Sequence, residues 1–247
     1  MIEAVSNPTL RVADVTGIAE LAAAHGALLV VDNTFTTPAM FRPMQHGADI
    51  VINSITKFLA GHSDVTLGYV AARDPGLRTA IYDAAVTWGT TPSPFDCWLA
   101  ERGLHTFDLR FEKAQATAAA LADALAGRDG IRQVIYPGRA DHPHHNRAGT
   151  LFGGQFGNML SFEIEGGRDE VNSFVMNAGG IPFAPTLGDV GCTLSHPASS
   201  SHRALTTEGR AALGISEGYF RLSVGIEPPE LVLAELDAAL AAVRGES

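Results

Sequence analysis

The chain has 247 residues, 46% of them hydrophobic and 18% charged, a composition typical of a globular protein with one large core or two smaller ones. Its formal net charge of −10, without any basic run, argues against nucleic-acid binding and against an anionic membrane surface as a partner. No apolar run reaches the ~18 residues of a membrane span, and the first ten residues lack the basic start and apolar core of a secretion signal.

The first half of the chain alternates between helical and strand-like segments. Asp14 can cap a helix that Gly26 closes, because the apolar positions between them fall on one face: Val15, Ile18, Leu21 and Ala22. A strand is expected at residues 27–31, where a continuous apolar run is typical of burial on both faces.

A short helical connection at residues 43–46 leads to two further apolar runs, at residues 50–52 and 67–71. Strands that alternate with helices predict an α/β fold, in which a parallel or mixed sheet is covered by helices.

The pattern changes after an Ala-rich helix expected at residues 111–126. Strand-like segments that alternate more strongly follow it, at residues 131–136, 159–164 and 220–224, separated by helical stretches at residues 168–177 and 229–243. This arrangement predicts a smaller α+β domain. We therefore expect two domains, residues 1–125 and residues 126–247.

The candidate chemistry lies where predicted strands end. In parallel or mixed sheets the ligand site is found at the carboxyl ends of the strands, and both Asp32 and the segment 54–57 fall at such ends. Only two of the 17 basic residues are lysines, Lys57 and Lys113. A buried lysine can lose its proton, whereas arginine cannot, so Lys57 is the candidate reactive amine, and Lys113 is expected to be a solvated surface charge.

Several segments of the chain resemble the Cys/Met-metabolism family of pyridoxal-phosphate (PLP) enzymes, which includes cystathionine γ-synthase, cystathionine γ-lyase, methionine γ-lyase and the homoserine-ester sulfhydrylases. In chain order the matching segments are SNPT at 6–9, VDNTF at 31–35, SITKFLAGHSD at 54–64, YPG at 136–138, MLSFE at 159–163, LGD at 187–189, SHPA at 195–198 and RLSVG at 221–225. The resemblance covers essentially the whole chain. It implies the type I, aminotransferase-like PLP fold with a partial large domain.

The resemblance also implies how PLP is held. Lys57 would bind the cofactor covalently and later move protons on the substrate, while Asp32 would keep the pyridine nitrogen protonated, which makes the ring an electron sink. Ser54 and Thr56 would donate hydrogen bonds to the phosphate. Asn7 would contact the ring hydroxyl or the substrate carboxylate.

Two residues of the second half would bind the substrate. Arg221 would hold the substrate carboxylate through a two-pronged ion pair. Thr186 stands where the family usually has a serine that touches both the lysine and the substrate. The implied reaction is elimination or replacement at Cγ or Cβ of cysteine, cystathionine, methionine or an O-acylated homoserine. Pro185 replaces a glutamate that several family members carry, so a tail without a second ammonium group is expected to be preferred.

Other clusters have simpler interpretations. Three histidines within residues 142–145 suggest a metal site, but a proline splits the run and the family commonly has a structural turn here, so no metal is predicted. Cys97 and Cys192 are expected to be buried structural thiols in a reducing, cytoplasmic compartment. The glycine-rich segment 153–157 follows no buried strand and opens no helix, which argues against a phosphate loop.

The resemblance begins in the middle of the family's large domain, and the family's N-terminal third has no counterpart. That third normally supplies a phosphate-binding loop, a tyrosine that stacks on the ring, and an arm that reaches across the dimer. The chain would then be a split subunit in a homo- or hetero-oligomer completed by another polypeptide, a fragment of a longer gene product, or a cofactor-free relic. The alternative function is a non-catalytic scaffold or regulatory subunit that retains the fold.

Overall fold

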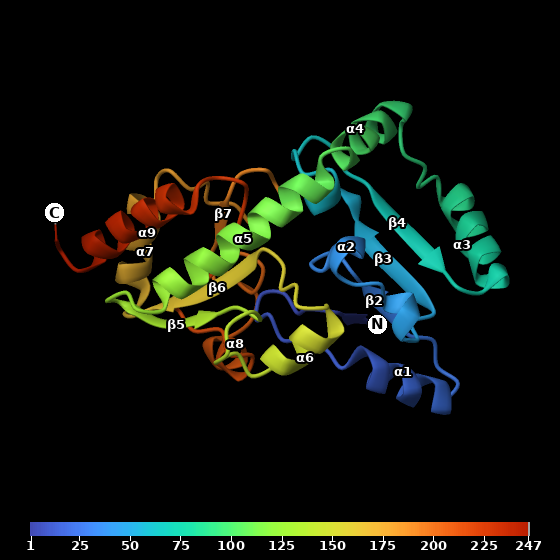
Figure 1. Ribbon diagram of the computed structural model, residues 1–247, viewed down its shortest axis with the longest axis horizontal. Coiled ribbons are helices and arrows are strands. Elements are labelled where there is room, and N and C mark those ends of the chain that lie inside the picture. The colour runs from blue at the N-terminus through green and yellow to red at the C-terminus, as the bar shows by residue number, and fades with distance from the viewer. Residues whose placement is uncertain (247) are drawn as a thin grey trace.

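The computed structural model describes residues 1–246, which form two four-stranded sheets bridged by a long helix (Figure 1). The first sheet has the order β1-β2-β3-β4, with bounds Ile2–Glu3, Val30–Asp32, Ile50–Ser54 and Gly68–Ala72. Its first three strands are parallel and β4 is antiparallel, which confirms the predicted mixed sheet. The second sheet has the order β5-β6-β8-β7 and is antiparallel, with bounds Ile131–Ile135, Met159–Ile164, Tyr219–Ser223 and Thr193–Ser195.

The helices have the bounds α1 Val15–Ala24, α2 Thr37–Met40, α3 Pro75–Trp88, α4 Pro94–Leu104, α5 Phe107–Leu125, α6 His145–Leu151, α7 Arg168–Asn177, α8 Thr207–Ala212 and α9 Pro229–Val243, with a 3₁₀ turn η1 at Pro43–His46 and a π turn η2 at Ile55–Leu59. Helices α3 and α9 lie toward opposite ends of the molecule, whereas α5 crosses its centre (Figure 1). Within residues 1–246, no helix combines the length and the apolar character needed to cross a membrane.

Helix α1 begins as the sequence predicts, because the Asp14 side chain accepts a hydrogen bond from the Gly17 amide at 3.1 Å. Gly26, just past its end, has the positive φ of +63° that glycine adopts without steric cost. The expected apolar face is only partly right. Val15 and Ala19 are the buried positions of the helix, whereas Leu21 is 60% exposed because it points away from the sheet.

The burial of the strands reverses the expectation from sequence. The first sheet was expected to hold strands covered on both faces, yet β3 alternates between buried and half-buried residues, and β2 is only three residues long. Leu28 lies in the apolar run before β2 and is 54% exposed. The second sheet was expected to alternate, yet every residue of β8 is buried. Its second face is covered by chain segments that are far away in sequence.

Helix α5 belongs to both halves of the molecule and runs over both sheets in Figure 1. Phe107 and Phe111 near its start pack into the core of the first sheet, whereas Leu121 and Leu125 near its end are fully buried in the core of the second. A division at residue 125 therefore coincides with the end of a shared helix, and it stays a prediction.

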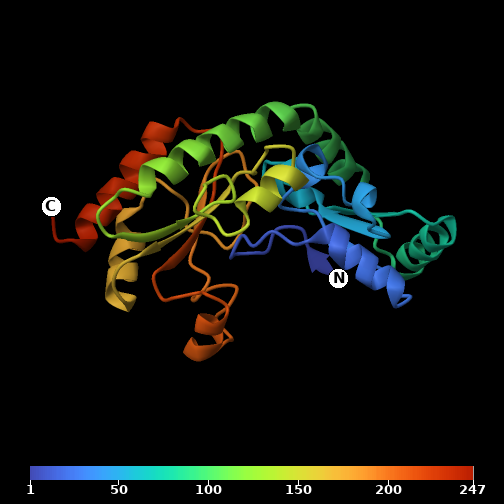
Figure 2. The same cartoon turned by 60° about the horizontal axis from the view of Figure 1, so that its bottom comes forward.

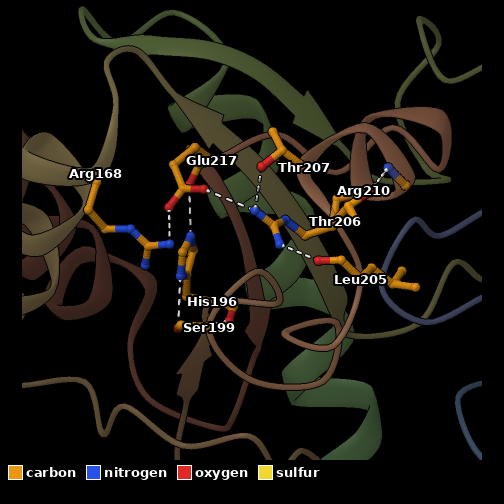
Figure 3. A network of polar contacts seen from close by, with 9 residues as sticks. Arg168, His196, Ser199, Leu205, Thr206, Thr207, Arg210 and Glu217 are labelled. Atoms are coloured by element: carbon orange, nitrogen blue, oxygen red, sulfur yellow. Dashed lines mark hydrogen bonds and ion pairs between the residues drawn. The ribbon is translucent and has the colours of Figure 1, made fainter.

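A segment between β7 and β8 carries α8 away from the body of the molecule (Figure 2). Figure 3 shows how its base is tied down: the Glu217 carboxylate lies 2.5 Å from Arg168 and 3.6 Å from Arg210. The buried ring of His196 bonds the Glu217 carbonyl through Nε2 at 2.7 Å and the Ser199 hydroxyl through Nδ1 at 2.9 Å. The part of this segment next to the body of the molecule is thus fixed by polar contacts, while α8 itself has no buried residue.

Candidate active site

The candidate site is built at the carboxyl ends of the first three strands. Asp32 ends β2 and pairs in register with Glu3, which ends β1, while Ser54 ends β3. The turn η2 begins directly after Ser54 and contains Lys57. Parallel strands bring their carboxyl ends to one edge of the sheet, so residues roughly 25 positions apart in sequence become neighbours.

A cavity of about 200 Å³ lies at this edge. Its lining residues are Glu3, Val5, Asn7, Asp32, Thr34, Phe35, Ser54, Lys57 and Leu187. Four of the residues predicted from sequence therefore face one space: Asn7, Asp32, Ser54 and Lys57. Sequence reasoning missed Glu3 and Thr34, although a polar residue at the end of a strand, or two positions after it, was the available signal.

The Lys57 amine reaches across to the second half of the chain. Its Nζ donates to the hydroxyl of Thr186 at 3.1 Å. Burial lowers the pKa of Lys57 below its ordinary value, and the nearby positive charge of Arg221 lowers this pKa further. Both effects favour the neutral amine, which is the form that attacks an aldehyde.

Arg221 stands on β8 and is only 4% exposed. Its guanidinium donates to the Asn7 side-chain oxygen at 2.8 Å and to the Thr186 carbonyl at 2.7 Å, while its Nε is buried without a hydrogen-bond partner. None of the ion pairs found within residues 1–246 includes Arg221. Burial lowers the pKa of Arg221 to about 10, so it remains a cation at neutral pH. A buried cation without a carboxylate fits an anionic ligand.

Asn7 lies beside Arg221 because the turn that contains Asn7 is hydrogen-bonded to the second sheet. The carbonyl of Pro8 accepts hydrogen bonds from the Ser161 hydroxyl and from the Tyr219 hydroxyl, both at 2.9 Å. Both donors are buried on β6 and β8. The second sheet thereby holds a part of the site that belongs, in sequence, to the first.

Among the predicted cofactor-binding residues, Thr56 is the one that does not line this cavity; the predicted substrate-binding residues Arg221 and Thr186 also lie outside its lining. Its hydroxyl donates to the Leu67 carbonyl at 3.1 Å and accepts from the Leu67 amide at 2.9 Å. These two bonds join η2 to the segment before β4. The predicted contact between Thr56 and a phosphate stays a prediction.

The remaining candidates lie elsewhere. The ring nitrogens of His144 and His145 bond the Val12 amide and the Pro137 carbonyl, as a structural turn requires. Cys192 is buried, and burial raises the pKa of its thiol to about 12. Cys97 is exposed on α4, so the expectation of a buried thiol was wrong there; the buried positions of this helix are Ala100 and Gly103.

Comparison with known proteins identifies the family of the chain. A sequence profile of the Cys/Met metabolism PLP-dependent enzyme family matches residues 1–241. The chain belongs to this family. It is 41% identical over 239 residues to cystathionine beta-lyase of Bacillus subtilis, covering 97% of this chain and 61% of that protein. It is 39% identical to O-succinylhomoserine sulfhydrylase of Pseudomonas aeruginosa, covering 98% of this chain and 60% of that protein.

Solved structures agree in fold. Cystathionine gamma synthase from Xanthomonas oryzae pv. oryzae, crystallised in complex with cystathionine, superposes with a TM-score of 0.94 at 45% identity, covering 100% of this chain and 63% of that one. The predicted PLP-enzyme fold is therefore confirmed. The chain spans about three fifths of the length of the curated relatives it matches.

The residues at the cavity fit the cofactor that the family uses. An amine with a lowered pKa suits an aldehyde, and a carboxylate at the same cavity suits a pyridine nitrogen: these are Lys57 and Asp32. The Ser54 hydroxyl lies between them in sequence and faces the same space. PLP, when bound, supplies an electron sink for negative charge at the substrate Cα.

Proposed function

We propose that this chain carries the catalytic lysine of a PLP-dependent enzyme that eliminates or replaces a substituent at Cγ or Cβ of sulfur amino acids or O-acylhomoserine. The observation that carries the proposal is the position of the Lys57 amine, which lines one cavity with Asp32 and bonds Thr186. Membership of the Cys/Met metabolism family gives this amine its chemical context.

The proposed roles follow from the contacts. Lys57 would hold the cofactor and would take the substrate Cα proton, because burial and the charge of Arg221 lower the pKa of its amine. Asp32 holds the pyridine nitrogen; its Oδ1 already accepts from the Thr34 amide at 2.9 Å, which orients the carboxylate. Ser54 donates to the phosphate, and Thr56 does so once its hydroxyl proton turns away from the Leu67 carbonyl.

The substrate carboxylate is bound by Arg221, with Asn7 beside it. The guanidinium is held by Asn7 and by the Thr186 carbonyl at 2.8 and 2.7 Å, which fixes the plane in which it would pair with a carboxylate. Thr186 touches both groups, since its hydroxyl accepts from Lys57 and its carbonyl accepts from Arg221. It therefore couples the position of the base to that of the substrate.

The site is completed by a polypeptide that corresponds to the N-terminal third of the relatives. A groove of about 820 Å³ shares Asp32, Thr34 and Ser54 with the site cavity and continues between β4 and α3. Its far wall is apolar and open: Val70 is 51% exposed and Tyr82 is 69% exposed. Such a surface, beside a site in a chain of three fifths the usual length, suits a further layer of the same fold.

Borohydride trapping tests the cofactor assignment. The completed protein is loaded with PLP, reduced, digested and analysed by mass spectrometry. The label is expected on the peptide that contains Lys57; Lys113 is the internal control, since it is exposed on α5 and the chain has no third lysine. Label on Lys113 would refute the assignment, and the absence of any visible PLP band would favour the non-catalytic scaffold.

Complementation tests the proposed partner. The 247-residue chain is titrated with a polypeptide that carries the N-terminal third of a relative. PLP absorbance and γ-elimination are expected only in the mixture, because the chain by itself leaves the groove open. Turnover by the isolated chain at about 1 per second or faster, an ordinary enzymatic rate, would overturn this part of the proposal.

A further inference from the structure

The turn η2, which contains Lys57, has no backbone donors of its own for its last carbonyls. Lys57 interrupts η2 with φ −86° and ψ −132°, and the turn closes two residues later at Leu59. The last carbonyls of any helical turn have no partner within it and need donors from outside. In this turn the carbonyls of Phe58 and Leu59 need such donors, whereas the Ala60 carbonyl already accepts from Nδ1 of His62 at 2.6 Å.

Arg110, on α5, supplies these donors from 50 to 52 residues away. Its guanidinium donates to Phe58 at 2.9 Å, to Leu59 at 3.0 Å and, more weakly, to Ala60 at 3.4 Å. Its Nε donates to the Thr106 hydroxyl at 3.1 Å, which fixes the plane of the fork. The planar guanidinium of this one side chain therefore fixes the backbone conformation at the end of the turn.

The opposite side of the same backbone is closed by Gly188. A Cβ at this position would lie 2.6 Å from the Phe58 nitrogen and 2.9 Å from the Lys57 Cα, so no larger residue fits there without movement. The segment that holds Lys57 is thus confined between α5 and the loop that carries Thr186.

We propose that Arg110 is a positioning residue for Lys57: by binding the carbonyls that follow it, Arg110 holds the amine against Thr186 and in front of Asp32. The inference rests on the proposed role of Lys57 as the cofactor lysine. Arg110 touches neither the cavity nor the amine, so it acts through the backbone alone.

The titration midpoint and the labelling rate of the Lys57 amine test this role in the absence of any cofactor. The chain without PLP is labelled with trace acetic anhydride across a pH series, and mass spectrometry gives the titration midpoint and the labelling rate of Lys57 relative to those of Lys113. In the wild-type chain Lys57 should titrate below Lys113, because it is partly buried near the charged Arg221. If Lys57 matches Lys113 in midpoint and also in labelling rate, the amine is not confined and the proposal fails.

Arg110→Met should release the turn. The Lys57 midpoint is then expected to rise toward that of Lys113, and its limiting labelling rate to increase several-fold, while Lys113 is unchanged. Thr106→Val keeps Arg110 but removes the hydroxyl that orients it, so a smaller change in the same direction is expected. This milder variant decides the question if Arg110→Met does not fold.

Arg128→Met is the matched control. Arg128 also makes two side-chain bonds to a distant element, to Asp237 at 2.9 and 3.2 Å, but it lies in the other half of the molecule. If Arg110→Met lowers the melting temperature as Arg128→Met does and leaves the Lys57 titration unchanged, Arg110 is merely structural and the proposal fails. Because no PLP is present, a failure to bind PLP would count against the proposed function alone.

Discussion

The two sheets of this protein differ in how completely they are covered. In the second sheet every residue of β8 is buried, and the rings of Phe162, Phe174 and Phe220 lie with centroids 4.9–5.9 Å apart. In the first sheet β4 leaves alternate residues exposed, and the adjacent helix α3 has no buried residue. The second sheet is a closed core, whereas the first is open on the side of the groove.

This difference separates two tasks within one site. The closed sheet provides Arg221 and the anchors for Pro8, which are held by buried hydrogen bonds. The open sheet provides Asp32, which lines both the groove and the site cavity, and it leads into the turn η2, whose Lys57 lines the site cavity. Under the proposed function the closed sheet would bind the substrate and the open sheet the cofactor, and four predictions test this division.

The largest effect is expected at the amine of the open sheet. Lys57→Ala should abolish borohydride-trapped PLP in the completed protein and lower turnover by about 10²–10⁴-fold, the range for one positioned acid–base group. Steady-state kinetics and mass spectrometry measure both. Lys113→Ala, on the exposed face of α5, should change neither. Substantial turnover by Lys57→Ala would show that another group does the chemistry.

Unfolding of the isolated chain compares the two cores directly. Phe220→Ala removes a fully buried ring and should lower the free energy of unfolding by about 3–5 kcal/mol, enough to abolish a cooperative transition in a marginally stable chain. Tyr82→Ala, at 69% exposure, should change it by less than about 0.5 kcal/mol. Urea titration followed by circular dichroism measures both. Similar losses from the two variants would mean that the first sheet is already covered in solution.

Arg221→Lys tests the closed sheet's share of the site. The charge stays, but the two-pronged geometry is lost, so substrate binding should weaken by roughly 1.5–3 kcal/mol while PLP absorbance is kept. Competitive inhibition by a substrate analogue gives the affinity. Arg132→Lys, whose side chain is 54% exposed, is the control. Loss of PLP or of the fold in Arg221→Lys would make Arg221 structural.

The smallest effect concerns the substrate tail. Pro185 is exposed and its neighbour Phe183 is 48% exposed, and neither side chain can offer a carboxylate to a second ammonium group. O-acetylhomoserine should therefore be preferred to cystathionine, by about 0.5–2 kcal/mol in transition-state terms. Competition between the two substrates in the completed protein measures the ratio. A clear preference for cystathionine would place a partner for its amino group elsewhere, for instance on the covering polypeptide.

Much of the local structure could be predicted because short-range signals specify it. Helices α7 and α9 and strand β6 have the predicted bounds, since their apolar periods and their starting residues lie within the segments themselves. The Asp14 cap and the Gly26 turn are local for the same reason. The SITKFLAGHSD segment carried the family resemblance, which the match over residues 1–241 confirms.

Burial and long-range contacts required the tertiary structure. Strand β3 of the first sheet alternates in burial and β8 of the second is buried throughout, the opposite of the expectation, because an apolar period shows which residues can be covered but not which neighbour covers them. The Lys57–Thr186 bond joins residues 129 positions apart, and the Arg221–Asn7 bond joins residues 214 apart.

The sequence by itself therefore determined which residue types stand at the strand ends and which amine is available for a cofactor. Only the tertiary structure decided that Thr56 turns to Leu67, that Glu3 joins the cavity, and that Arg110 binds the carbonyls after Lys57. The physical reason is that hydrogen bonds of this kind depend on the relative placement of whole elements. That placement follows from the packing of α5 across both cores and from no local pattern.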